Sequence, residues 1–413
     1  MLPVSGTNSR SRPLLEAGGD RAAAPSSRQQ RSIGTMISLE NLVKKFPIAG
    51  GVKVAVDDIS FDLPDGEFFT LLGPSGCGKT TTLRSIAGLE KPTAGTISID
   101  GQKVYDNKLL VPANKRGLGM VFQSYAVWPH MSVFENVAFP LRVADERPKR
   151  SEVKRRVHET LELVDLGGLG DRPATMLSGG QQQRLSLARA LVREPKMLLL
   201  DEPLSNLDAK LRDRMRSELR VIQQHLGITT LFVTHDQVEA LSMSDRVAVM
   251  NNGKIEQIGG PRDVYHDPVT AFVANFIGGA NTLDGIVESV ESDGSAVLST
   301  KFGPIRGRGL PNLVEGLPAV ASIHLEDVQL STDDRAEISQ NNVFEGTVSL
   351  GLFNGPSVVY RVYVGDQLIE AQLGGHDALA RGSEVRVILP KRHIRILPRG
   401  PEDQALVRGA EEK

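Results

Sequence analysis

The sequence predicts an α/β fold built on a mainly parallel sheet that is covered on both faces, followed by a second domain that is all β. For the first domain, continuous apolar segments typical of buried strands alternate with amphipathic helical segments. A glycine-rich loop also joins one of these strands to a helix. For the second domain, short β-like segments separated by Gly, Pro, Asp and Asn extend from about residue 283 to residue 397.

The composition agrees with this division. At roughly 100–200 residues per domain, the 413 residues of the chain indicate two or three domains, and 40% of them are hydrophobic. The 48 Lys and Arg residues nearly balance the 50 Asp and Glu residues, which argues against broad electrostatic binding of nucleic acid. A single cysteine excludes an intramolecular disulfide framework. No apolar run is long enough to cross a bilayer, so we expect membrane association only through a partner.

The expected strands follow in chain order. Alternating apolar residues predict strands at residues 37–39 and 52–56. A compact apolar strand at residues 67–72 leads into the glycine-rich loop, and a helix is expected behind the loop at residues 79–89. The dipeptide Asn252-Gly253 marks a hairpin after the last strand of this domain. Further apolar strands are expected at residues 118–122, 196–200, 229–233 and 247–250.

Helices are expected between these strands. The region of about residues 124–195 is mostly helical in pattern, and we interpret it as a helical insertion within the α/β domain. A later helix begins after Asp208, whose carboxylate suits an N-cap, and it carries apolar residues at steps of three and four. These apolar residues are Leu211, Met215, Leu219, Ile222 and Leu226.

The domain boundaries follow from these patterns. Residues 1–35 are rich in Arg, Ser, Pro and Ala without apolar periodicity, so we expect a disordered extension or a start placed too early, with Met36 as the true beginning. The α/β domain is expected at residues 36–280. The all-β domain, barrel-like in its texture, is expected at residues 281–400 and is followed by a tail at residues 401–413.

The loop at residues 73–80 matches the phosphate-binding pattern G-x-x-x-x-G-K-[ST] between a strand and a helix. Its glycines let backbone N–H groups turn toward phosphate oxygens, and the N-terminus of the next helix favours anions. We expect Lys79 to reach the β and γ phosphates and the Thr80 hydroxyl to coordinate Mg²⁺. The expected nucleotide-binding residues are Gly73, Pro74, Ser75, Gly76, Cys77, Gly78, Lys79, Thr80 and Thr81.

A second pattern is an apolar strand that ends in two carboxylates, Asp201 and Glu202. We expect Asp201 to hold Mg²⁺ directly or through water, and Glu202 to polarise the attacking water as general base. Alone, the pattern would also fit a strand that ends in a solvated acidic turn. Together with the phosphate loop, it favours nucleotide hydrolysis.

A third pattern is a Ser-Gly-Gly turn that opens a helix, within the sequence LSGGQQQR at residues 177–184. Such a helix start is another place where backbone N–H groups favour an anion. One nucleotide does not need two such sites from a single chain, so we expect this turn to meet the γ-phosphate of a nucleotide held by another subunit. The residues expected to make this contact are Ser178, Gly179, Gly180 and Gln181.

Taken together, these motifs resemble those of the ATPase subunits of ABC transporters, whose signature is Leu-Ser-Gly-Gly-Gln, and the resemblance covers roughly residues 36–280. It implies a P-loop NTPase core with a β subdomain and a helical insertion. It implies that Gln123 links Mg²⁺ and water to the membrane partner. It also implies that Asp208 belongs to a loop across the dimer interface and that His235 contacts the γ-phosphate. Phe46 stands where the family places an aromatic side chain under adenine, although it could instead be part of the core.

The resemblance also implies partners. An ATPase of this family works as a homodimer, with each Mg·ATP between Lys79 of one chain and Ser178 of the other. Integral membrane permease subunits, and indirectly a solute-binding protein, are the implied partners, at the cytoplasmic face of the inner membrane. Trp128 lies in the aromatic-rich stretch after Gln123 and is the candidate contact for a helix of the permease, although this stretch could instead be the core of the helical insertion.

Residues 281–400 resemble, more loosely, the OB-like regulatory domain of importer ATPases for polyamines, iron and sugars. Such barrels can bind oligonucleotides, but we find no basic stripe interleaved with aromatic residues and expect no nucleic acid partner. We therefore predict an importer ATPase, with polyamine, ferric iron and sugar all open as solute and a mild preference for the first two. The alternative is a soluble ABC ATPase that remodels a protein or nucleic acid complex.

Overall fold

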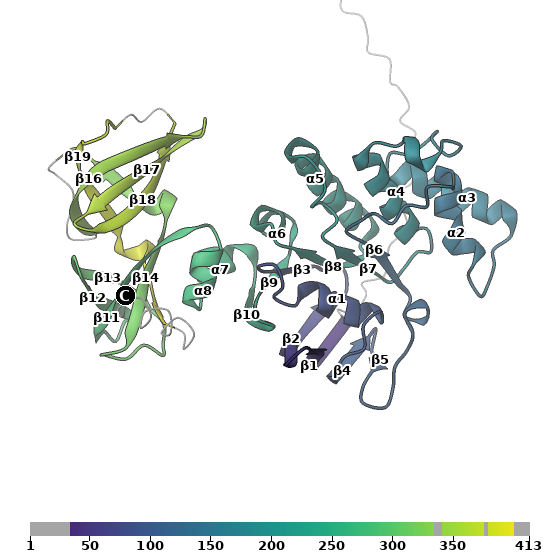
Figure 1. Ribbon diagram of the computed structural model, residues 1–413, viewed down its shortest axis with the longest axis horizontal. Helices are drawn as coiled ribbons and strands as arrows, with labels where there is room; N and C mark the ends of the chain where they lie inside the picture. The colour runs from purple at the N-terminus through teal and green to yellow at the C-terminus, as the bar shows by residue number, and fades with distance from the viewer. Residues whose placement is uncertain (1–33, 334–340, 376–378, 400–413) are drawn as a thin grey trace, which may run out of the picture. The chain divides into compact units, whose positions relative to one another are not determined.

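The computed structural model of the chain describes residues 34–333, 341–375 and 379–399. Apart from its last two residues, the predicted extension at residues 1–35 lies outside the described residues, as does the whole of the predicted tail at residues 401–413. The described residues form an α/β domain followed by all-β structure, which confirms the predicted fold class (Figure 1).

The main sheet of the α/β domain consists of β3 (Phe68–Leu72), β6 (Leu118–Val121), β7 (Met197–Asp201), β8 (Thr229–Thr234), β9 (Arg246–Asn251) and β10 (Lys254–Gly259). Its strand order is β10-β9-β3-β8-β7-β6. All neighbours pair in parallel except β9 and β10, which form the predicted hairpin. Every residue of β3, β7 and β8 is buried, as their continuous apolar sequences predict.

The strands predicted near the start of the domain belong to a separate antiparallel sheet. This sheet has the order β2-β1-β4-β5. Its strands are β1 (Thr35–Ile48), β2 (Gly51–Pro64), β4 (Ala94–Ile99) and β5 (Gln102–Tyr105). Ile37 and Leu39 of this sheet share a core with Leu199 and Leu231 of the main sheet. One face of the main sheet is therefore covered partly by strands, and this separate sheet confirms the predicted β subdomain.

Helices complete the α/β domain. They are α1 (Lys79–Ala87), α2 (Val133–Arg142), α3 (Arg150–Leu163), α4 (Gly179–Leu191), α5 (Ala209–Leu226) and α6 (Gln237–Met243). The helices α2, α3 and α4 contact one another and form the predicted helical region (Figure 1). Asp208 is the N-cap of α5, as predicted, and its Oδ1 accepts a hydrogen bond from the N–H of Leu211 at 3.0 Å.

Two short helices that the sequence patterns did not indicate, α7 (Pro261–His266) and α8 (Ala271–Phe276), precede the all-β part. There β11 (Ala280–Val290), β12 (Ser295–Thr300), β13 (Gly303–Gly309), β14 (Pro318–His324) and β20 (Arg395–Pro398) form a closed barrel. A further sheet contains β15 (Gln329–Ser331), β16 (Asn341–Phe353), β17 (Ser357–Val364), β18 (Gln367–Gly374) and β19 (Glu384–Pro390).

The sequence pattern suggested a single barrel for the all-β part. The structure has a closed barrel and, in addition, a separate sheet. The barrel closes through β20, which lies far along the chain and pairs Arg395 with Arg308 of β13 and with Ser322 of β14. Short alternating segments predict strands, but they do not predict which distant strands pair.

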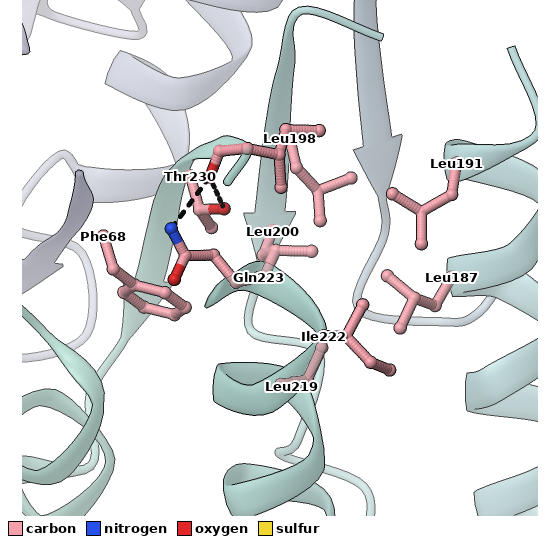
Figure 2. Close-up of a pocket in the computed structure, with 10 residues that line it drawn as sticks. Phe68, Leu187, Leu191, Leu198, Leu200, Leu219, Ile222, Gln223 and Thr230 are labelled. Atoms are coloured by element: carbon pink, nitrogen blue, oxygen red, sulfur yellow. Dashed lines mark hydrogen bonds between the residues drawn. The ribbon is translucent and has the colours of Figure 1, made fainter. Parts of the chain in front are cut away.

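A small internal void lies between β7, α4 and α5 (Figure 2). Its volume is about 10 Å³, and its lining is apolar apart from Gln223 and Thr230. Gln223 is 4% exposed, and its amide donates hydrogen bonds to the carbonyl oxygens of Gly66 and Ile228, both at 2.9 Å. One side chain therefore joins the turn before β3 to the connection between α5 and β8.

We predict that Gln223→Leu lowers the free energy of unfolding by about 2 kcal/mol, because two buried carbonyl groups lose their donor. Denaturant titration of the purified chain measures this change. Val221→Ala, at a position 63% exposed on the same helix, is the matched control. A loss no larger than that of the control would show that the amide bridge adds nothing to stability.

Candidate nucleotide site

The predicted phosphate loop lies between β3 and α1, and close backbone approaches require glycine at two of its positions. A Cβ on Gly73 would stand 2.2 Å from the carbonyl oxygen of Met250, and one on Gly78 would stand 2.2 Å from that of Ala55. Gly78 is also the N-cap of α1 with φ 106°, in the left-handed region that favours glycine. The loop is thus packed against the backbone of β9 and of β2.

The lysine of this loop is buried against its own backbone. Lys79 is 4% exposed, and its ammonium donates hydrogen bonds to the carbonyl oxygens of Gly73 at 2.8 Å and Pro74 at 2.9 Å. The Cys77 Sγ lies 3.8 Å from the same ammonium. A buried cation is unfavourable unless acceptors compensate it. The loop therefore concentrates positive charge where phosphate oxygens are expected.

Asp201 ends β7 beside the start of α1. Its side chain is nearly buried, and its Oδ1 accepts a hydrogen bond from the Thr80 hydroxyl at 2.9 Å. Burial raises the pKa of the Asp201 carboxyl, whereas the Thr80 hydrogen bond and the charge of Arg84 act in the opposite direction. The Arg84 guanidinium lies 3.6 Å from Oδ2. Two adjacent oxygen donors, a hydroxyl and a carboxylate, fit the preference of Mg²⁺.

The structure brings Glu202, His235 and Gln123 together. The Oε2 of Glu202 lies 3.2 Å from Nδ1 of His235 and 3.3 Å from Nε2 of Gln123. Glu202 follows β7, His235 follows β8 and Gln123 follows β6, and these strands are neighbours in the sheet. Glu202 also has a φ of 45°, uncommon for a residue other than glycine. Such local strain is often found at functional sites.

Two residues of the loop that the resemblance places before Asp208, Ser205 and Asn206, support this cluster. The Ser205 hydroxyl donates a hydrogen bond to the carbonyl oxygen of Glu202 at 2.9 Å. The side-chain amide of Asn206 donates one to the backbone carbonyl oxygen of Gln123, also at 2.9 Å. Both acceptors are backbone oxygens, so the sequence pattern that marks this loop does not indicate these two bonds. Arg84 was also missed, although it lies one helical turn after Thr80 and therefore on the same side of α1.

The Ser-Gly-Gly turn forms the N-terminus of α4. Ser178 is the N-cap, and its side chain and that of Gln181 form a capping box. Ser178 and Gly179 are exposed, whereas Gly180 is buried and faces Leu211. Among the described residues, no hydrogen bond or ion pair joins this turn to the phosphate loop of the same chain. Its predicted contact with a nucleotide on another subunit stays a prediction.

Phe46 and Asp208 are the remaining predicted contacts. Phe46 is partly buried in β1, with the Lys44 ammonium 4.5 Å from its ring centroid, and it belongs to none of the hydrophobic clusters found among the described residues. Asp208 is exposed at the start of α5. Neither arrangement tests the role predicted for the residue.

Trp128 is held in place on the helical region rather than fully exposed. Its ring centroid lies 4.5 Å from that of Phe139 and 4.6 Å from the Arg189 guanidinium. Arg189 also donates hydrogen bonds to the carbonyl oxygens of Tyr125 and Ala126. The segment after Gln123 is therefore tied to α4 through one arginine.

The fold, the phosphate loop and the carboxylates at the strand ends define a P-loop ATPase. Comparison with known proteins identifies the family. The family model described as ABC transporter matches residues 56–205, and the one described as TOBE domain matches residues 321–397. The solved structure of cbiO1 from Clostridium perfringens is 30% identical, with a TM-score of 0.50, and covers 56% of this chain and 90% of its own.

Relatives match much more of the chain. The trehalose/maltose import ATP-binding protein MalK of Thermococcus litoralis is 43% identical over 86% of this chain and 96% of its own length. The spermidine/putrescine import ATP-binding protein PotA of Rubrobacter xylanophilus is 46% identical over 87% of this chain and 93% of its own length. The Fe(3+) ions import ATP-binding protein FbpC of Photorhabdus laumondii is 53% identical over 59% of this chain and 67% of its own length.

The chain therefore belongs to the ABC transporter family, as an ATP-binding and ATP-hydrolysing subunit of the import type with a C-terminal TOBE domain. This result confirms the predicted class and supports it over the alternative of a soluble remodelling ATPase. No helix in the described part of the chain is both long and apolar enough to cross a membrane.

We predict that saturating ATP protects Cys77 from alkylation, because a thiol inside the phosphate loop is covered by bound phosphates. Labelling without nucleotide should already be slow, since burial raises the pKa of the Cys77 thiol. Cys77 is the only cysteine, so mass spectrometry of the intact chain measures the rate directly. AMP, which lacks the β and γ phosphates, is the control. Equal rates with and without ATP would place this loop away from the nucleotide.

Proposed function

We propose that two copies of this chain close around two Mg·ATP and that hydrolysis reopens them, which drives import through membrane subunits. The observation that carries the proposal is the meeting of Glu202, His235 and Gln123 beside the pair formed by Thr80 and Asp201. ATP favours the closed dimer to the extent that it binds that state more tightly than the open one. Hydrolysis removes this difference in affinity.

Thr80 and Asp201 would hold the Mg²⁺ of the bound nucleotide, and Gln123 would contact it from β6. Among the described residues there is no group of three or more His, Cys, Asp and Glu side chains that could hold a metal. Mg²⁺ needs none, because it usually takes one or two carboxylates together with phosphate oxygens and water. When bound, the ion neutralises charge that develops on the phosphates.

The residues of the site divide the remaining work. Lys79 exchanges its carbonyl partners for the β and γ phosphates, and the backbone N–H groups of the loop bind the phosphate oxygens. Glu202 takes the proton of the attacking water, and Gln123 orients that water. His235, within 3.2 Å of the same carboxylate, contacts the γ-phosphate. Phe46 stacks on the adenine ring.

The second subunit supplies the other half of each site. Ser178, Gly179, Gly180 and Gln181 would reach the γ-phosphate that the partner's phosphate loop holds, and Asp208 would cross the interface. The exposed Ser178 and Gly179 at the start of a helix of 13 residues support this arrangement, since their backbone N–H groups can meet an anion from outside.

Integral membrane permease subunits, and through them a solute-binding protein, are the proposed partners, at the cytoplasmic face of the inner membrane. The relatives named above import a sugar, a polyamine or ferric iron, so one of these classes is the proposed solute. The permease contact is proposed at the segment around Trp128, where α4 and the residues after Gln123 are tied together.

We predict that Glu202→Gln abolishes turnover but keeps ATP binding, so that ATP drives the chain into a dimer that persists. Sedimentation with and without Mg·ATP measures the dimer, and phosphate release measures turnover. Lys79→Ala should instead weaken ATP binding itself, because the phosphates lose their main cation. Glu159→Gln, the same change at an exposed position of α3, should behave like the unchanged chain.

Full turnover by the Glu202→Gln chain would remove Glu202 from the proposed role. Unchanged ATP affinity in the Lys79→Ala chain would contradict the proposed role of Lys79 in binding the phosphates.

We predict that multi-spanning membrane proteins co-purify with the tagged chain from gently solubilised membranes and that Trp128→Ala weakens this association. The matched control is Phe353→Ala, an exposed aromatic position on β16 of the second domain. Mass spectrometry of the captured proteins measures the outcome. Capture of ribosomal proteins or DNA in place of membrane proteins would contradict the importer assignment.

A further inference from the structure

One arginine near the nucleotide site contacts two segments with different predicted tasks. Arg212 lies in α5, one turn after the N-cap Asp208. Its guanidinium donates a hydrogen bond to the carbonyl oxygen of Leu207 at 3.0 Å and another to Oδ2 of Asp236 at 3.4 Å. The first acceptor directly precedes Asp208, and the second directly follows His235.

The third group near Arg212 is buried. Glu239 of α6 is 3% exposed, and its Oε1 lies 3.9 Å from Nε of Arg212. That Nε is itself buried and has no hydrogen-bond partner. Because a hydrogen bond needs a distance near 3 Å, a small movement of α6 or of the guanidinium would complete this contact. Arg212 therefore has a donor without a hydrogen-bond partner close to a buried carboxylate.

Asp236 connects the guanidinium to the backbone around His235. Its Oδ1 accepts hydrogen bonds from the N–H groups of Val238 at 2.8 Å and Glu239 at 3.1 Å, so it caps α6. Glu239 in turn accepts the Thr234 hydroxyl at 2.5 Å. Both residues that flank His235 are thus held by the first turn of α6, and Arg212 contacts that turn from α5.

We propose that Arg212 is a positioning residue that couples the segment of Asp208 to the segment of His235, so that dimer closure and contact with the γ-phosphate occur together. This inference rests on the proposed function. A planar guanidinium can span three acceptors at once, which a lysine ammonium on a flexible chain does less well. Its charge also compensates the buried carboxylate of Glu239, which no other ion pair of the described residues contacts.

The test uses Arg212→Met and Arg212→Lys, each in the unchanged chain and in the Glu202→Gln chain. Three quantities are measured: ATP affinity of the monomer, the ATP concentration at half-dimerisation, and turnover. Arg216→Met is the matched control, because Arg216 lies one turn further along α5 and pairs locally with Asp213 at 3.0 Å.

We expect Arg212→Met to leave the ATP affinity of the monomer within about twofold. The ATP concentration at half-dimerisation should rise about tenfold, as expected for loss of a charge-assisted hydrogen bond. Turnover should fall by a similar factor. The Arg212→Lys chain should give values between those of the unchanged chain and those of the Arg212→Met chain. Arg216→Met should change none of the three quantities. In the background of Asp236→Asn, the effect of Arg212→Met should shrink, because the two changes remove the same contact.

Equal half-dimerisation for the Arg212→Met and Arg216→Met chains would overturn the coupling. So would a monomer affinity that falls as much as dimerisation does, because Arg212 would then act through the fold of the site. If the Glu202→Gln chain does not dimerise with ATP at all, the proposed function is wrong and the coupling fails with it. Melting temperatures show whether Arg212→Met has lost its fold. If it has, the same comparison with Arg216→Met is made with the Arg212→Lys chain, whose half-dimerisation then decides the outcome.

Discussion

Parallel pairing of β6, β7 and β8 is the constraint on which the site depends. The register places Val121 beside Leu200 and Asp201 beside Val233, so the residues that follow these strands leave the sheet at one edge. Gln123, Glu202 and His235, which are far apart in the sequence, therefore meet around one carboxylate oxygen. Because β7 and β8 are buried on both faces, a slip of one residue would exchange their side chains between two packed faces and disrupt the packing on each of them.

The charged groups of the site have partners within the chain that a bound nucleotide would have to replace. The Lys79 ammonium is held by two carbonyl groups of its own loop, and the Asp201 carboxylate by the Thr80 hydroxyl with Arg84 nearby. Under the proposed function, bound phosphates and Mg²⁺ would replace these partners, so binding would reorganise the same few contacts on which hydrolysis is proposed to depend. The hydrogen bonds of Arg212 join the residue before Asp208 to the residue after His235, so under the proposed coupling they would extend this link to the dimer interface.

Much of this arrangement can be predicted from the sequence, because the motifs are local. The loop at residues 73–80, the acidic end of β7 and the N-cap Asp208 are each recognised within a few residues, and the last of these is confirmed. Contacts such as Asn206 with the Gln123 carbonyl or Arg212 with Asp236 depend on distant backbone positions, which no local pattern records. The division of the second domain into a barrel and an added sheet was missed for the same reason. It depends on which distant strands pair, as Arg308 does with Arg395 where the barrel closes.

The central claim is that each triphosphate is bound by unlike loops from two copies of the chain. A structure of the Glu202→Gln chain with Mg·ATP tests it most directly. The account predicts a dimer in which the γ-phosphate lies within hydrogen-bond distance of Lys79 of one protomer and Ser178 of the other. A γ-phosphate that contacts residues of a single protomer only would contradict it.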